Sequence, residues 1–236
     1  MFDYGEVGAT ASPLTGSVRA DRIAELQQRV HQMQGTALSQ PVPTLPALQP
    51  LLTLRTGASY AVDSPALAMA LMAGPSAAGW WSAVVGLPEL GIEAAAALGV
   101  ALERTVLVPD PGAAWLNVVA TLAEVLPVVV TRPPAAVGQH DAARLTARLR
   151  QRGAVLIALG DWPRADARLR VVRSRWSGIG AGHGHLAGGV LTVQARRADA
   201  RRTEAELCWP DASAGLRAPE PGRRPAPDLT LVEAAG

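Results

Sequence analysis

The feature that most constrains the fold is a regular alternation between residues 45 and 165, where short apolar runs take turns with Ala- and Leu-rich segments. The segments of helical pattern predict helices at 65–73, 87–98, 113–125 and 141–152. The apolar runs predict strands at 59–62, 80–85, 105–108, 128–131 and 154–159. Strands that alternate with helices imply a mostly parallel sheet, and strands that are apolar throughout are covered on both faces. The sequence therefore predicts an α/β fold with three layers.

The pattern changes after residue 165. Two strand-like runs, 169–176 and 190–196, are separated by a Gly-rich segment, which predicts an antiparallel hairpin that extends the sheet. Residues 199–236 are polar and Pro-rich, a composition typical of disordered tails. We therefore place the core at 45–198 and a flexible tail at 199–236.

The segment before the core predicts an N-terminal helix at 17–34, followed by a Pro-punctuated linker at 40–46 that cannot be helical. Residues 1–44 therefore form an appendage. One side of the helix carries an apolar stripe that must be buried, either on this core or against a partner or second copy. The stripe consists of Ile23, Leu26, Val30 and Met33.

The charge, the cysteine content and the apolar segments of the sequence limit its ligands and its location. The net charge is +2 and all 22 basic residues are Arg, so only local Arg clusters favour nucleic acid as a ligand. Cys208 is the single cysteine, which excludes an intramolecular disulfide. No secretory signal is visible at 1–16, and the Ala-rich stretch at 92–102 is too short to span a bilayer. We expect a cytoplasmic protein with no membrane contact.

The turn between the first strand and the first helix is where ATPases of this layout bind phosphate, through a Gly-rich loop that ends in Lys-Ser/Thr. Here the turn reads Asp63-Ser64-Pro65. Asp63 or Ser64 falls at the helix cap, where a side-chain oxygen takes the free N–H groups. The turn therefore predicts a degenerate nucleotide site with no cofactor and no catalytic residues. The alternative is an unusual nucleotide site.

Other groups that could support catalysis or bind metal are weak candidates. The strand at 128–131 ends in Thr131 where a Mg²⁺ ligand would be acidic, and Asp110 and Asp161 both lie in turn sequences. The two His of the segment 182–185 have no carboxylate or thiol partner nearby. We expect no metal ion and no enzyme activity.

Arg residues cluster around the predicted hairpin, and two interpretations remain open. On one face they would form a phosphate-binding stripe that contacts nucleic acid weakly. Alternatively, they are solvated charges that protect an edge strand from aggregation. The residues in question are Arg164, Arg168, Arg170, Arg173, Arg175, Arg196 and Arg197, with Arg201 and Arg202 following.

Two of the six Trp residues stand apart. Trp162 lies in a turn sequence and Trp209 in the predicted tail, whereas the other four fit strands or helices. Trp is a frequent anchor of protein interfaces. We therefore expect Trp162 and Trp209 to be exposed anchors for a partner.

Two stretches carry a resemblance to a known family. The first reads ARLTARLRQRGAVLIALG at 143–160, followed by Trp162 and Pro163. The second reads LRV at 169–171, WSGIG at 176–180 and GHGHL at 182–186. Together they resemble the RecA-like mutasome accessory proteins of the ImuA type, especially the actinobacterial branch, over roughly residues 17–198.

The resemblance implies a RecA-like core and a role in damage-induced (SOS) mutagenesis. Members of the ImuA-type family work with ImuB, a Y-family polymerase-like protein, and with an error-prone DnaE-type polymerase. The resemblance also implies contact with RecA. The segments that correspond to the DNA-binding loops of RecA, 133–139 and 161–165, are short, so we expect no filament on DNA. The alternatives are a SulA-like cell-division inhibitor and a residual ATPase or recombinase paralogue.

Overall fold

Residues 39–177, 188–209, 215–219 and 229–231 are the part of the chain that the structure, a computed structural model, describes. The chain divides into two units, Met1–Ala37 and Leu38–Gly236, and every described residue belongs to the second. The predicted helix at 17–34 and the His pair at 182–185 lie outside the described residues.

The strands of this unit form a single sheet in the order β3-β2-β4-β5-β1-β6-β7-β8, with β9 paired to β6. The strands from β3 to β6 in that order are parallel, and β7, β8 and β9 add antiparallel pairings. The bounds are β1 Ser59–Val62, β2 Ser82–Val85, β3 Thr105–Val108, β4 Val128–Thr131, β5 Val155–Leu159, β6 Ala167–Ser177, β7 Gly188–Arg197, β8 Arg202–Trp209 and β9 Leu229–Leu231.

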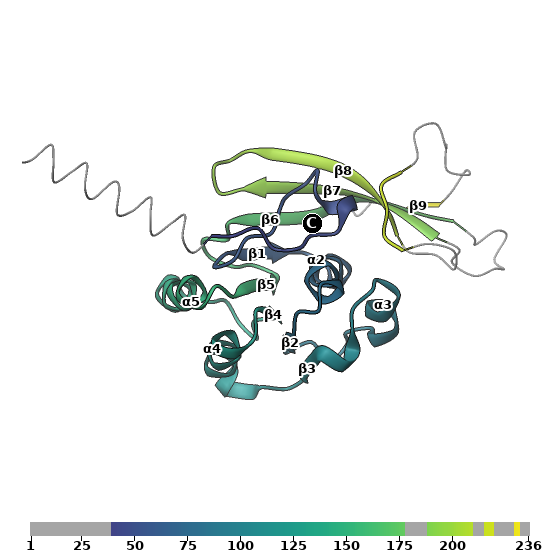
Figure 1. Ribbon diagram of the computed structural model, residues 1–236. Helices are drawn as coiled ribbons and strands as arrows, with labels where there is room; N and C mark the ends of the chain where they lie inside the picture. Colours follow the sequence, from purple (N-terminus) through teal and green to yellow (C-terminus); the bar gives the residue numbers. More distant parts are fainter. Residues whose placement is uncertain (1–38, 178–187, 210–214, 220–228, 232–236) are drawn as a thin grey trace, which may run out of the picture. The chain divides into compact units, whose positions relative to one another are not determined.

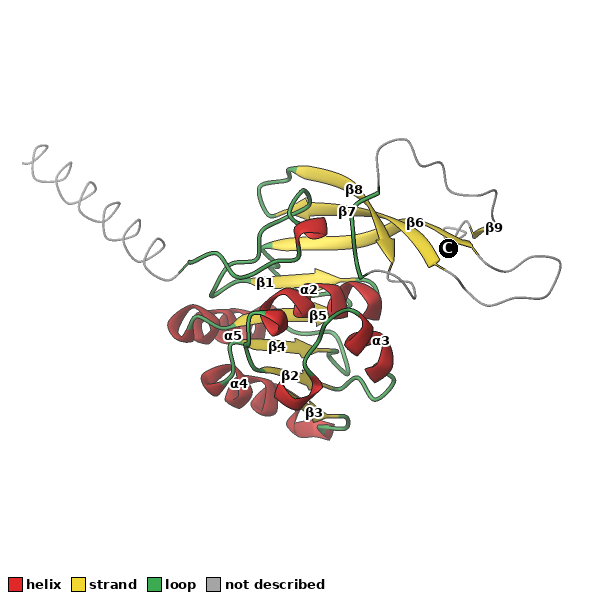
Figure 2. Cartoon of the chain, turned by 45° about the vertical axis from the view of Figure 1, so that its right-hand side comes forward, coloured by secondary structure: helices red, strands yellow, loops and turns green. Residues whose placement is uncertain are grey.

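Helices cover both faces of the parallel strands (Figures 1 and 2). Alternate residues of each strand enter two separate cores, as the pleat requires: Tyr60 and Val62 pack with α2 and α3 on one face, and Ala61 packs with α4 and α5 on the other. The helix bounds are α2 Pro65–Ala77, α3 Ile92–Ala97, α4 Trp115–Val125 and α5 Gln139–Arg152, with short 3₁₀ turns at Pro46–Leu48, Leu102–Arg104 and Gly112–Ala114.

The predicted fold class is confirmed. The strands at 59–62, 105–108 and 128–131 have the predicted bounds, and the hairpin of β6 and β7 extends the sheet as expected. None of the helices in the described ranges is both long and apolar enough to cross a membrane. The helix predicted at 87–98 is shorter, because Pro88 and Gly91 precede its first turn at Ile92.

Helix α2 runs past residue 73, where the predicted helix ends, and continues through Gly74 and Pro75 to Ala77. The reason for the glycine is packing. A Cβ on Gly74 would lie 2.7 Å from the carbonyl oxygen of Pro43 and 2.9 Å from the backbone nitrogen of Leu45. Gly74 therefore lets the chain at 43–45 cross directly over α2.

The Pro-rich segment expected as a free linker is part of the core unit. Val42 is 2% exposed, and its N–H donates to the carbonyl of Leu54 at 2.8 Å. The Thr44 hydroxyl accepts a hydrogen bond from the N–H of Leu54. Backbone and side-chain bonds thus hold residues 42–44 against 54, although Pro excludes regular secondary structure there.

The expectation of a disordered tail is wrong for residues 202–209, which form β8. Its core-facing residues, Ala205 and Leu207, alternate with the polar Arg202, Glu204 and Glu206. This alternation is typical of an edge strand with one solvated face. High polarity and the preceding Arg-rich turn hid the pattern in the sequence.

Candidate functional site

The turn between β1 and α2 caps the helix with its own side chain, Ser64. Ser64 has extended backbone angles, and its Oγ accepts a hydrogen bond from the N–H of Leu67 at 3.3 Å. Pro65 occupies the first helical turn, where its missing N–H has no cost. The N–H groups that would cradle a phosphate at this position are in part satisfied by the protein itself.

Asp63 is not the cap but continues the strand pairing of β1. Both of its carboxylate oxygens accept the N–H of Val171, at 3.2 and 3.1 Å. The backbone pairing of β1 with β6 ends at Val62 and Leu169, so the carboxylate replaces the next backbone acceptor. It does so just before a bulge, since the register of β6 shifts between Val171 and Arg173. Asp63 therefore has a structural role at this turn.

An ATPase of this layout would carry an acidic Mg²⁺ ligand at the end of β4. Here that position is the neutral Thr131, and its hydroxyl is already hydrogen-bonded within the protein. Trp115 Nε1 donates to Thr131 Oγ1 at 2.7 Å, and that hydroxyl donates to the carbonyl of Val85 at 3.1 Å. Asp110 accepts from the N–H of Gly112 and so forms the predicted turn. Among the described residues, no three His, Cys, Asp or Glu side chains are grouped to hold a metal ion.

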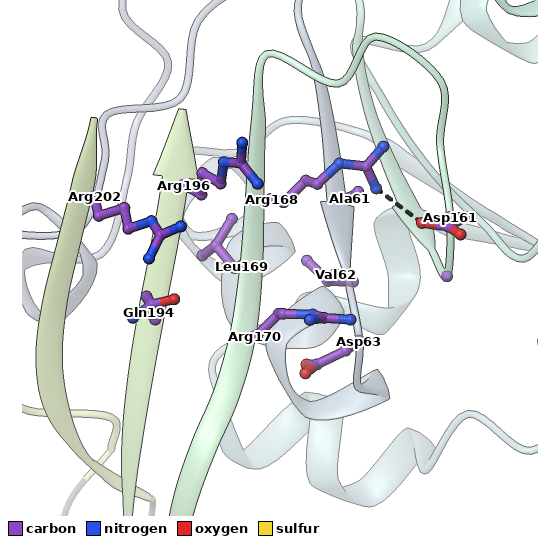
Figure 3. A pocket seen from close by; sticks show the side chains of 11 residues that line it. Ala61, Val62, Asp63, Asp161, Arg168, Leu169, Arg170, Gln194, Arg196 and Arg202 are labelled. Atoms are coloured by element: carbon purple, nitrogen blue, oxygen red, sulfur yellow. Dashed lines mark hydrogen bonds and ion pairs between the residues drawn. The ribbon is translucent and has the colours of Figure 1, made fainter. Parts of the chain in front are cut away.

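A pocket of about 450 Å³ opens at the carboxyl ends of β1 and β5 and extends over β6, β7 and β8 (Figure 3). Parallel strands place their loops at this edge of the sheet, where ligands of α/β proteins bind. The charged residues that line the pocket are Asp63, Asp161, Arg168, Arg170, Arg196 and Arg202.

The strand register aligns three of these Arg residues in one row across the sheet. Arg168 of β6 is directly opposite Arg196 of β7, and Arg196 is directly opposite Arg202 of β8. Residues directly opposite on paired strands share a face. Arg170, two residues along β6 and opposite Gln194, adds a fourth guanidinium to that face.

Only Arg168 of this group is paired. Its Nη1 donates to Asp161 Oδ1 at 3.0 Å and its Nη2 donates to the carbonyl of Trp162 at 2.6 Å, so it fastens the loop after β5. Within the described ranges, the guanidinium groups of Arg170, Arg196 and Arg202 have no hydrogen-bonded or ion-paired partner.

The remaining Arg residues of the predicted stripe lie elsewhere. Arg173 and Arg175 follow the bulge of β6, and Arg175 forms an ion pair with Glu206 at 2.9 Å. Arg197 is opposite Ala167 and therefore on the other face, and Arg164 lies in the turn before β6 with φ of 57°. Arg202 joins the row only because β8, a strand that the sequence pattern does not predict, pairs with β7.

The expected partner anchors are placed differently from the prediction. Trp162 is 0% exposed and packs edge-on against Trp115, with ring centroids 6.5 Å apart, so an exposed role for Trp162 is wrong. Trp209 ends β8, half-buried against the core. The apolar stripe of Ile23, Leu26, Val30 and Met33 lies outside the described residues.

Tyr60, on β1, is a buried phenol in the core that β1 shares with α2. Its oxygen accepts the N–H of Arg55 at 2.8 Å, and burial raises the pKa of Tyr60 to about 12 from 10.0. The folded state holds the proton more tightly than the unfolded state does. The stabilisation is therefore fully present below pH 10 and is lost as the pH rises through about 12.

We expect the free energy of unfolding to fall by as much as about 1.4 kcal/mol per pH unit between pH 10 and pH 12. The chain has no Lys and Arg stays protonated, so few other groups titrate there. Urea unfolding at several pH values measures the fall, and Tyr60→Phe should remove most of it. An equal fall in Tyr60→Phe would assign the loss to another group.

A family model described as the MT3502 N-terminal domain matches residues 47–164, which is half of the chain and runs from the first turn of the core to the loop after β5. The uncharacterized protein Rv3395c of Mycobacterium tuberculosis is 35% identical over 105 residues. That alignment covers 44% of this chain and 52% of the relative, so the chain spans about half the length of the curated protein that it matches.

Proposed function

The chain belongs to the MT3502 N-terminal domain family, and we propose that it is a non-catalytic, RecA-like scaffold of a damage-induced translesion-synthesis complex. Its partners are a Y-family polymerase-like protein of the ImuB type and an error-prone DnaE-type polymerase, with RecA as a further contact. The scaffold works in the cytoplasm. The chain would hold these partners together rather than convert ATP hydrolysis into movement.

The observation that carries the proposal is the β1–α2 turn. The Ser64 hydroxyl takes the N–H of Leu67, and the Asp63 carboxylate takes the N–H of Val171. A phosphate placed here would meet a negative charge and would have to displace both interactions. At the end of β4, the hydroxyl of Thr131 is already bonded to Trp115 and Val85. These residues do not fit Mg-ATP.

The choice of partners rests on the resemblance of residues 143–186 to ImuA-type proteins. The described part of that stretch forms α5, β5 and β6, and β1 lies between the two strands in the sheet. The strand order, with parallel strands flanked by an antiparallel hairpin, is consistent with the RecA-like core that the resemblance implies. A scaffold of this kind needs a folded surface but no nucleotide chemistry.

We expect Mg-ATP to produce no saturable heat at the β1–α2 turn in isothermal titration calorimetry, and no turnover. Ser64→Asp is the matched variant, because Asp caps a helix as well as Ser does and adds a negative charge. Wild type and Ser64→Asp should give the same trace. A wild-type Kd below about 100 µM (about −5.5 kcal/mol) that is lost in Ser64→Asp would favour a residual ATPase.

A further inference from the structure

We propose that the pocket lined by Arg168, Arg170, Arg196 and Arg202 is a binding site for consecutive phosphate groups, such as those of a single-stranded nucleic-acid backbone. We call these four residues the Arg pocket. The inference does not rest on the scaffold proposal, because it concerns a different set of side chains and a different ligand.

Electrostatic repulsion within the Arg row favours an anionic ligand. Like charges directly opposite each other on neighbouring strands destabilise a sheet, and here the row Arg168–Arg196–Arg202 contains three guanidinium groups in succession. Asp161 pairs with Arg168 alone. Asp63 also lines the pocket, where its carboxylate accepts the N–H of Val171, so the lining carries four Arg against two Asp residues. The row is therefore short of negative charge, and an anionic ligand would supply it.

Another Arg on the same face of the sheet does have an acidic partner. Farther along β6, Arg175 is paired with Glu206 of β8, which is the arrangement expected of a solvated edge that needs no ligand. Across the pocket, by contrast, the residue of β8 that faces Arg196 is another Arg. Arg175 thus has an acidic partner on β8, whereas Arg196 faces Arg202, so edge protection alone does not explain the Arg row.

The length of the Arg row fits a ligand with several phosphate groups. Neighbouring strands lie about 4.8 Å apart, so the row covers about 10 Å. The row places one guanidinium on each of three neighbouring strands, so it can pair with about three phosphates, one for each Arg. Arg binds phosphate through two parallel hydrogen bonds. Figure 3 shows the guanidinium groups of Arg168, Arg170 and Arg202 at the pocket.

The residues that line the pocket do not favour recognition of a particular base. The pocket lining contains no aromatic side chain, so it offers no platform on which a base could stack. Contacts limited to phosphates read no sequence. We therefore expect binding that is weak, indifferent to sequence and steeply dependent on salt. An inorganic tripolyphosphate presents the same chemistry in a small molecule.

The test uses the full chain and two probes, a labelled 15-nucleotide oligothymidylate followed by fluorescence anisotropy and sodium tripolyphosphate followed by calorimetry. The variant Arg170→Gln/Arg196→Gln/Arg202→Gln removes the three unpaired guanidiniums and keeps the Arg168–Asp161 pair. The control Arg144→Gln/Arg150→Gln/Arg152→Gln removes the same charge from exposed positions of α5. Circular dichroism checks that all three proteins are folded.

Wild type should bind at least one probe, with a slope of log K against log [salt] near −2 for the oligonucleotide, from about three phosphates at about −0.7 each. The pocket variant should bind at least tenfold more weakly with a slope near zero, and the control should stay within about threefold of wild type. If only the oligonucleotide binds, the ligand is a nucleic-acid backbone. If only tripolyphosphate binds, the ligand is a small molecule with several phosphate groups.

A second readout does not need the natural ligand. Because the row repels itself, the pocket variant should melt at the same temperature as wild type or higher in phosphate-free buffer. Tripolyphosphate should raise the melting temperature of wild type and not of the variant. The proposal is overturned if neither probe binds wild type, if the variant binds as wild type does, or if a poly-Glu peptide binds more tightly than either probe.

Failure of this test is distinguishable from failure of the scaffold proposal. The pocket variant can be tested for capture of the polymerase-like partner in a separate experiment. Loss of phosphate binding in that variant therefore says nothing about the scaffold proposal. A chain that captures its partner and binds no phosphate would overturn the inference on the Arg pocket alone.

Discussion

Replacing Trp162 with Ala should lower the free energy of unfolding by about 3–5 kcal/mol, the usual cost of removing a large buried aromatic side chain. Trp162 is completely buried in the core between the sheet and helices α4 and α5, in edge-on contact with Trp115. It also anchors the loop that Arg168 holds through the Trp162 carbonyl. Urea unfolding followed by circular dichroism measures the loss.

Two variants make this prediction specific. Trp162→Phe keeps a ring against Trp115 and removes an indole N–H that has no acceptor within the described residues, so it should cost less than about 2 kcal/mol. Trp81→Ala is the surface control, because that side chain is 48% exposed, and it should change stability by less than about 1 kcal/mol. Equal stability of Trp162→Ala and Trp81→Ala would show that Trp162 is not a core residue.

Gly74→Ala should destabilise the protein by about 1–3 kcal/mol, although Ala is ordinarily the better residue in a helix. The new Cβ would lie 2.7 Å from the carbonyl oxygen of Pro43 and 2.9 Å from the nitrogen of Leu45. These are backbone atoms, so either the crossing segment or α2 has to move. Equilibrium unfolding in urea gives the size of the effect.

Gly138→Ala is the matched control for Gly74→Ala. Gly138 lies at the N-cap of α5 with a φ of −66°, and a Cβ there would meet nothing within 4 Å. Its replacement should cost less than about 1 kcal/mol, the modest difference between Gly and Ala at a cap. If Gly74→Ala were as stable as Gly138→Ala, residues 43–45 would not be packed on α2.

The sheet and its flanking helices were predictable because apolar runs and helical patterns alternate over residues 59–159. Each buried strand is a continuous apolar run bounded by turn residues, and such runs are the strongest signal of a parallel sheet. The turn at Asp63-Ser64-Pro65 was predictable as a capped helix for the same local reason. That Asp63 would bond to Val171 was not, because the partner lies 108 residues away along the chain.

Other features depend on contacts between distant segments and carry little local signal. The segment at 40–46 looks like a linker because of its Pro residues, yet Val42 is buried in the core. Its apolar character was the available signal. The Arg row needed β8 to be recognised, since only pairing with β7 brings Arg202 beside Arg196.

Affinity capture of the tagged full chain from cells treated with a DNA-damaging agent tests the central claim most directly. The scaffold proposal predicts recovery of a Y-family polymerase-like protein together with an error-prone DnaE-type polymerase. Ser64→Asp should capture both to the same extent, because the proposed assembly needs no nucleotide at the β1–α2 turn. Recovery of a tubulin-like division protein in place of either polymerase would contradict the proposal and favour a cell-division inhibitor.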